Sequence, residues 1–169
     1  MQPQPLGAFL SASVQHGPVP LSEAIALILP LFEQLQETHQ QGKVAPLVGL
    51  SHLKISNQKI WFHDFEATAP QLQLEEIRRV ERFLRRQEHQ TLRTAADEGA
   101  TTDDEIPPLQ PVFLTGYLTW EHQLGHHDPL TDIFSAGLIF ASLLCGLDLN
   151  EPADVERFTR AHHALTTLT

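Results

Sequence analysis

The C-terminal half of the chain carries a short run of side chains that commonly bind transition metals. The run spans His122, His126, His127 and Asp128. Neutral imidazole suits zinc, and His122 and His126 would share one face of a helix. Gly125 interrupts such a helix, however, and short histidine spacings are weak motifs. A metal site of His122, His126 and Asp128 is the alternative here; we favour a polar turn and expect no cofactor.

Basic residues form another group with possible chemistry, because six of the 11 lie on one predicted helix. They are Arg78, Arg79, Arg82, Arg85, Arg86 and Arg93. Such a cluster could contact phosphate groups, through Arg78, Arg82 and Arg86 above all. Interleaved glutamates indicate a solvated helix face instead. The formal net charge of -10 also disfavours nucleic acid and acidic membranes as partners.

Side chains for acid–base or nucleophilic catalysis are harder to find. Glu121 and His122 are adjacent and could transfer protons, but no serine or cysteine nucleophile with a positioned histidine is identifiable. The single cysteine, Cys145, excludes an intrachain disulfide, and it falls on a helix predicted to be buried, where thiols are usually inert. We therefore assign no catalytic residue.

Length and composition predict one soluble domain over residues 1–169, with 41% hydrophobic and 19% charged residues. The longest apolar run, from Phe134 to Leu147, is too short to span a bilayer. The N-terminus lacks the pattern of a signal peptide, so we expect a cytoplasmic protein without a membrane partner.

The periodicity of apolar residues predicts a mainly α-helical fold with one small β-hairpin. Residues 1–20 are expected to be an irregular lead-in with at most a short helix around Leu6 to Val14. The first long helix is capped by Ser22, is largely buried in its first half, is kinked at Pro30 and ends before Gly42. The hairpin follows between Leu53 and Phe62.

The C-terminal part of the chain is predicted to contain three helices and a loop. An amphipathic helix runs from Gln71 to about Ala96, and residues 97–110 form a flexible acidic loop. A helix that is apolar nearly all round starts at Thr131 or Asp132, runs to Cys145 and forms the centre of the core. Asn150 caps the last helix.

This order of elements resembles the C-terminal lobe of the protein kinase fold. The most specific stretch is Gly116-Tyr117-Leu118-Thr119-Trp120-Glu121 followed by Asp132-Ile133-Phe134-Ser135-Ala136-Gly137. Residues 116–121 resemble the kinase Ala-Pro-Glu region, and residues 132–137 resemble the start of the kinase central helix. Asp64-Phe65, after a hairpin, is similar to the Asp-Phe-Gly element. The N-terminal lobe has no counterpart here.

The resemblance implies structural roles for Glu121, Asp132 and Gly137. In kinases, the aspartate matching Asp132 accepts backbone N–H groups from the catalytic loop. The glutamate matching Glu121 pairs with an arginine near the end of the domain, a role that here falls to Arg157 or Arg160.

The departures from the kinase pattern concern catalysis. Leu47 stands where the base aspartate belongs, Gly49 stands in place of its lysine, and His52 replaces the metal-binding asparagine. No glycine-rich loop or strand lysine is present. Asp64 survives, so Asp64 and His52 are the only candidates for a residual nucleotide site, and they would hold Mg²⁺ weakly.

We therefore expect a non-catalytic, pseudokinase-like interaction or regulatory module, of a kind that occurs in bacteria within larger proteins. A protein partner or a second copy would bind the face left by the missing N-terminal lobe, near the first helix and the hairpin. Two alternatives stay open. One is a divergent phosphotransferase that receives an upper lobe from another chain. The other is a truncated structural fragment.

Overall fold

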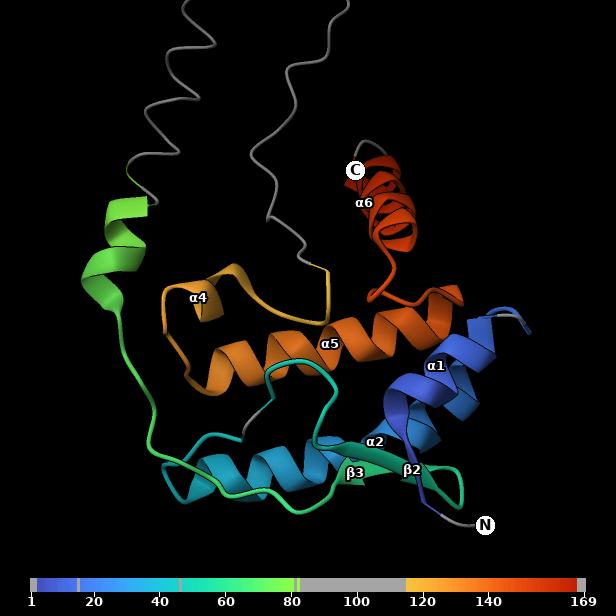
Figure 1. Cartoon of the computed structure of the whole chain (residues 1–169), viewed down its shortest axis with the longest axis horizontal. Helices are drawn as coiled ribbons and strands as arrows, with labels where there is room; N and C mark the ends of the chain where they lie inside the picture. The colour runs from blue at the N-terminus through green and yellow to red at the C-terminus, as the bar shows by residue number, and fades with distance from the viewer. Residues whose placement is uncertain (1–2, 15, 46, 81, 83–114, 167–169) are drawn as a thin grey trace, which may run out of the picture.

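The computed structural model describes residues 3–14, 16–45, 47–80, 82 and 115–166, with side chains described up to residue 160. It is mainly helical, with one small antiparallel sheet in the strand order β1-β2-β3 (Figure 1). In chain order the elements are β1 (Gln4–Pro5), α1 (Leu6–Val14), α2 (Leu21–Gln40), β2 (Leu53–Ser56), β3 (Lys59–Phe62), a helix at 74–80, α4 (Trp120–Gln123), α5 (Pro129–Cys145) and α6 (Pro152–Thr166).

The predicted hairpin is confirmed as β2 and β3. Its turn residues Asn57 and Gln58 have φ angles of 48° and 57°, the left-handed conformation that two-residue hairpin turns require. Alternate strand residues are buried, including Ile55 and Ile60, which face each other across the pair. The hairpin is therefore amphipathic, with one face in the core.

The short helix predicted around Leu6 to Val14 is confirmed as α1, whereas the irregular lead-in expected before it is wrong at Gln4 and Pro5. Gln4 pairs with Ile55 as a third strand, and α1 follows at once. Leu6 and Leu10 are both buried, so this segment is ordered by packing that is distant in sequence. Pro and Gly mark turns locally but carry no information on such packing.

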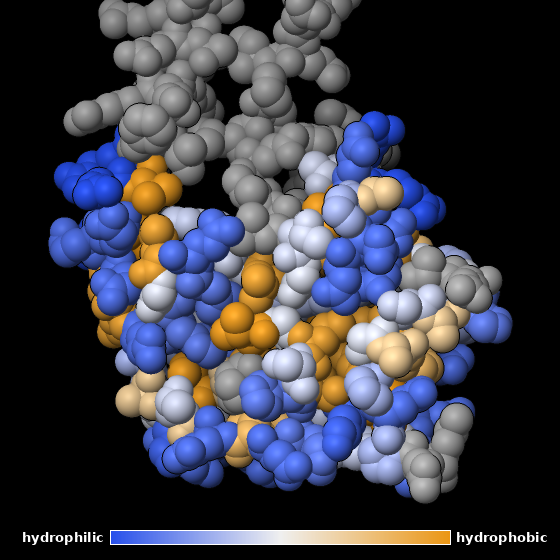
Figure 2. All heavy atoms as spheres, in the orientation of Figure 1, coloured by the Kyte–Doolittle hydropathy of each residue, from blue (hydrophilic) through white to orange (hydrophobic). Residues whose placement is uncertain are grey.

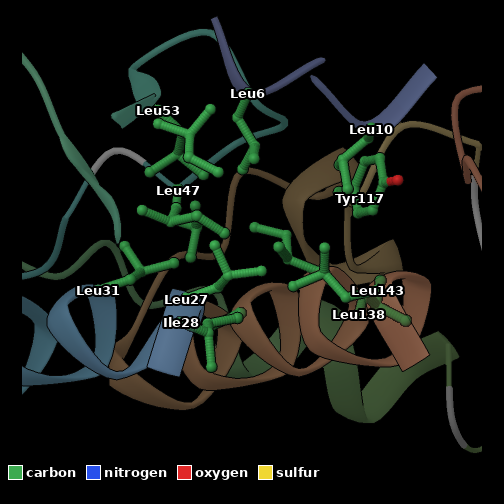
Figure 3. Packing of buried hydrophobic residues seen from close by; sticks show 14 of the residues in the cluster. Leu6, Leu10, Leu27, Ile28, Leu31, Leu47, Leu53, Tyr117, Leu138 and Leu143 are labelled. Carbon is green, nitrogen blue, oxygen red and sulfur yellow. The ribbon is translucent and has the colours of Figure 1, made fainter. Parts of the chain in front are cut away.

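The two long helices α2 and α5 form the centre of the molecule and run antiparallel. Val19, just before α2, donates its N–H to Leu143 near the end of α5, whereas His39 near the end of α2 lies beside Asp132 at the start of α5. The core between these helices and the sheet is mostly leucine and isoleucine (Figure 3). Ten of its members are Leu6, Leu10, Leu27, Ile28, Leu31, Leu47, Leu53, Tyr117, Leu138 and Leu143.

Helix α2 departs from the prediction at its N-terminus. It begins at Leu21 after Pro20, so Ser22 is not the cap, and Pro30 lies inside a helix that continues to Gln40. Its first half is also less buried than expected. Leu21, Ile25 and Leu29 are 59%, 45% and 51% exposed, because they lie to one side of the arc that packs on the core.

Helix α5 begins earlier than predicted, at Pro129. Its cap is Asp128, whose Oδ1 accepts the N–H groups of Leu130 and Thr131. Asp132 therefore lies in the first turn, and its side chain is free for other contacts. The helix is buried on one face only, since Leu130 is 75% exposed and Cys145 is exposed, which corrects the expectation of a helix and a thiol buried all round.

The remaining helices also have shifted starts. The helix predicted from Gln71 begins at 74, because Gln71 forms a bridge with His127 instead. The described residues do not include the later part of that helix, with three of the helix's arginines, or the loop at 97–110. Asn150 does not cap α6 from the adjacent position; its N–H and side-chain amide both donate to Asp148.

Candidate functional site

Leu47, which the sequence interpretation placed where a kinase base would be expected, is completely buried. It belongs to the hydrophobic core, and Figure 3 shows it in a packed group with Leu31 and Leu53. An aliphatic side chain can neither accept nor donate a proton. General base catalysis at this position is therefore impossible in the folded chain.

Asp64 and His52, the two candidates for a residual nucleotide site, lie at the end of the hairpin. The His63 N–H donates to the carbonyl of His52 at 2.8 Å, which places these two segments side by side. The Asp64 carboxylate is 84% exposed and lies 2.9 Å from Nε2 of His63. Asp64 thus points into solvent from a left-handed backbone (φ 52°), and its described partner is an imidazole.

Asp132 is the centre of a buried polar cluster. Its side chain is 0% exposed. Oδ2 accepts the backbone N–H of Ala45 at 2.9 Å and lies 2.9 Å from His39 Nε2, while Oδ1 lies 2.7 Å from His127 Nε2. A carboxylate only accepts, so each imidazole donates its Nε2–H. One carboxylate thereby joins α2, α5 and two loops.

The histidines predicted as possible metal ligands are close together but bind other groups. His126 Nδ1 accepts the N–H of Gln73 at 3.0 Å, and His127 Nε2 is committed to Asp132. Asp128 is engaged by its own helix N-terminus and lies 3.3 Å from His126 Nε2. Within the described ranges, no group of three or more His, Cys, Asp or Glu side chains is arranged to hold a metal ion.

His122 packs against this cluster with one ring nitrogen unsatisfied. Its Nδ1 accepts the N–H of Thr119 at 3.2 Å, its ring lies edge-on to that of His127 at 4.9 Å, and its Nε2 is buried without a hydrogen-bond partner. Burial lowers the pKa of His122 to about 4, and repulsion from His127 acts in the same direction. His122 is therefore neutral at physiological pH, which suits packing better than acid–base exchange.

Another buried polar network, around Tyr117 and Asp148, was not predicted. The Tyr117 hydroxyl lies 2.8 Å from Ser142 Oγ, donates to Asp148 at 3.2 Å and accepts the N–H of Leu149. Ser11 of α1 donates to the same Asp148 at 2.6 Å. Burial raises the pKa of Tyr117, so the phenol is protonated and acts as a structural donor.

Glu121 and Gly137, the other two residues assigned structural roles, make fewer contacts. Arg157 and Arg160 pair with Asp154 and Glu156 inside α6, and among the described ion pairs neither reaches Glu121. A methyl group added at Gly137 would meet no atom within 4 Å. The backbone of α5 is thus not closely approached at this glycine.

The described part of the arginine-rich helix carries local ion pairs. Arg78 lies 3.0 Å from Glu75, Arg79 lies 3.0 Å from Glu76, and Arg82 Nε donates to the carbonyl of Arg78. Arg86 lies outside the described residues. Neutralised pairs of this kind give little free positive charge for a phosphate backbone.

Of the face where a partner was expected, the first long helix carries exposed apolar side chains and the hairpin does not. The hairpin buries its hydrophobic residues, and in the loop before it only Val48 is a large exposed one. The others occur on α2 and around the start of α5, and hydrophobic atoms reach the surface in Figure 2. The described exposed set is Leu21, Ile25, Leu29, Val48, Leu72, Leu74, Leu130, Ile133 and Phe134.

Comparison with protein-family models, curated proteins and solved structures gave no match. A search of the described helices found none with the length and apolar character needed to cross a membrane. The candidate residues are accordingly described by their own geometry, with Asp132 at the centre of a buried cluster and Asp64 in an exposed turn.

Proposed function

We propose that this chain is a non-catalytic, pseudokinase-like module that acts by binding another protein. The observation that carries the proposal is the complete burial of Leu47 in the core. At the position where the resemblance places a proton acceptor, the chain has a packed aliphatic side chain. Phosphoryl transfer to a hydroxyl group depends on a residue that orients the nucleophile and accepts its proton.

The contact between Ala45 and Asp132 supports the kinase-like part of the proposal. Ala45 lies two positions before Leu47, in the segment aligned with the catalytic loop, and its N–H donates to Asp132 at 2.9 Å. This is the kind of contact that the resemblance implies for Asp132. A buried carboxylate that accepts a loop amide and two imidazoles stabilises a fixed scaffold and leaves no oxygen for a substrate.

The surface of α2 supports binding as the activity. Leu21, Ile25 and Leu29 repeat every four residues, so they form one exposed stripe along a helix. An exposed stripe of large apolar side chains on an otherwise strongly acidic chain is typical of a surface covered by another protein. We therefore propose α2 as the partner face, which is the helix part of the face expected from the sequence.

The experiment that tests this function is a thermal-shift titration with ATP in the presence of Mg²⁺ or Mn²⁺. A chain without phosphate-binding groups should melt at the same temperature with and without nucleotide. A saturable rise that Asp64→Asn abolishes would instead favour the divergent phosphotransferase. Asp128 and Asp154 are unsuitable control positions because each accepts a backbone N–H, so the exposed Glu151→Gln is the matched surface variant.

A further inference from the structure

A groove between α2 and the β2-β3 hairpin has the features of a binding site that the proposed function does not use. It has a volume of about 490 Å³. Its helix side is formed by Pro30, Glu33 and Glu37, and its hairpin side by Asn57, Lys59 and Trp61. Residues 30, 33 and 37 are spaced by three and four, so they share one face of α2.

The two walls of the groove are held together by a direct hydrogen bond. Gln34, on the same helix, accepts the backbone N–H of Phe62 at 2.8 Å through its Oε1. Ile60 and Phe62 of β3 are buried in the core, which directs the intervening Trp61 to the outer face of the strand, where it lines the groove. The groove is therefore preformed, so no binding free energy is lost in assembling it when a ligand binds.

Carboxylates dominate the charge of the groove. Glu33 and Glu37 are exposed, and neither takes part in an ion pair within the described chain. Lys59 is the single basic residue among those lining it, so two carboxylates face one ammonium group. The formal charge of -10 on the whole chain adds attraction for a cation.

The remaining surfaces favour a planar cation over a compact one. Trp61 is half-buried and offers an indole face, on which guanidinium groups stack. Pro30 adds an apolar surface to the same groove.

We propose that this groove binds an arginine side chain from a segment of a partner protein. The guanidinium group stacks on Trp61 and donates to Glu33 and Glu37, while neighbouring apolar side chains of the segment contact Pro30. Arginine fits because its planar guanidinium group can stack on an indole while its fork of donors pairs with carboxylates, whereas a lysine ammonium has no planar face. This site is separate from the apolar stripe of α2, so the inference rests on the proposed protein binding but not on that stripe.

The test uses the full chain and a synthetic probe, an acetylated and amidated hexapeptide with two arginines set between leucines. Binding is followed by the fluorescence of Trp61, with Trp120→Phe introduced throughout so that one indole reports. We expect saturable binding that weakens as salt is raised. The double variant Glu33→Gln/Glu37→Gln should weaken binding by roughly five-fold or more, as expected for loss of two charged contacts.

Matched controls distinguish binding in the groove from nonspecific attraction of a cationic peptide to an acidic chain. A peptide with citrulline in place of arginine keeps the shape without the charge and should bind at least roughly five-fold more weakly. Glu151→Gln, an exposed glutamate outside the groove, should bind like the parent chain. Equal binding of both peptides, equal binding by the double variant, or no binding at about 1 mM peptide would each overturn the proposal. Circular dichroism verifies that each variant is folded.

Discussion

Nε2 of His39, near the end of α2, lies 2.9 Å from Oδ2 of Asp132, in the first turn of α5, although 93 positions separate the two residues. His127 contacts the other oxygen of the same carboxylate at 2.7 Å. The ends of the two central helices are thus joined through one buried charge. This arrangement is structural in character, because both carboxylate oxygens accept donors from within the chain.

Replacing Asp132 should strongly destabilise the fold. Asp132→Ala leaves the Ala45 N–H and two imidazoles without their acceptor in a buried site, and such losses cost about 3–5 kcal/mol. Urea denaturation measures the free energy of unfolding. The exposed Glu33→Ala, in the middle of α2, is the matched control and should change stability by less than about 0.5 kcal/mol. A similar small change for Asp132→Ala would contradict the account.

The two imidazoles on Asp132 should be energetically coupled. His39→Ala and His127→Ala each remove one donor from the same carboxylate, so their effects on the free energy of unfolding should deviate from additivity by about 0.5–3 kcal/mol. A double-mutant cycle gives this value. In the control cycle, His39→Ala is combined with His63→Ala; these two histidines share no partner, so their effects should add. If the effects added in both cycles, Asp132 would not couple His39 and His127.

Stability should fall as pH falls through the range set by His122. Its pKa drops from 6.5 to about 4 on folding, chiefly through burial. Between these values the unfolded chain binds more protons than the folded one, so the free energy of unfolding rises with pH in this window. His122→Asn keeps an acceptor for the Thr119 N–H but does not titrate, and it should flatten the slope across this window. If the variant kept the slope of the parent chain, groups other than His122 would cause the pH dependence of stability.

Substitution by alanine should change stability in opposite directions at two glycines. Gly137 lies mid-helix in open space, so Gly137→Ala should stabilise the chain by about 0.5–1 kcal/mol. Gly146 has φ of 61°, and its added methyl would lie 2.8 Å from the backbone of Gly17 and Pro18. Gly146→Ala should therefore destabilise by about 1 kcal/mol or more. Thermal unfolding of both variants checks the pair, and destabilisation by Gly137→Ala would indicate a close contact at that face.

The parts of the fold that local patterns determine were predictable. Strand alternation and a short turn between Leu53 and Phe62 identified the hairpin, and apolar residues at helical spacing identified the long helices. Helix starts were less predictable, although Asp128-Pro129 is a cap followed by proline at the first helical position, which is a recognisable start signal. Thr131 and Asp132 are themselves common capping residues, and the predicted start was therefore later than the observed one.

The candidate site was predictable only where a motif identified its members. Asp132 was assigned a buried structural role from the resemblance, but nothing in the sequence around His39 signals that it would reach Asp132. The same holds for Ser11 and Asp148, which are 137 positions apart. Contacts between distant segments depend on how the helices pack, and local periodicity does not encode that packing. The exposed face of α5 was missed for the same reason.

The measurement that tests the central claim most directly is transfer of the labelled γ-phosphate of ATP by the purified chain, to itself and to a generic acceptor protein, with Mg²⁺ and with Mn²⁺. With Leu47 in place of a base, incorporation should not exceed that of the heat-denatured chain. Incorporation above that level, lost in Asp64→Asn and retained in Glu151→Gln, would establish a phosphotransferase and contradict a non-catalytic role.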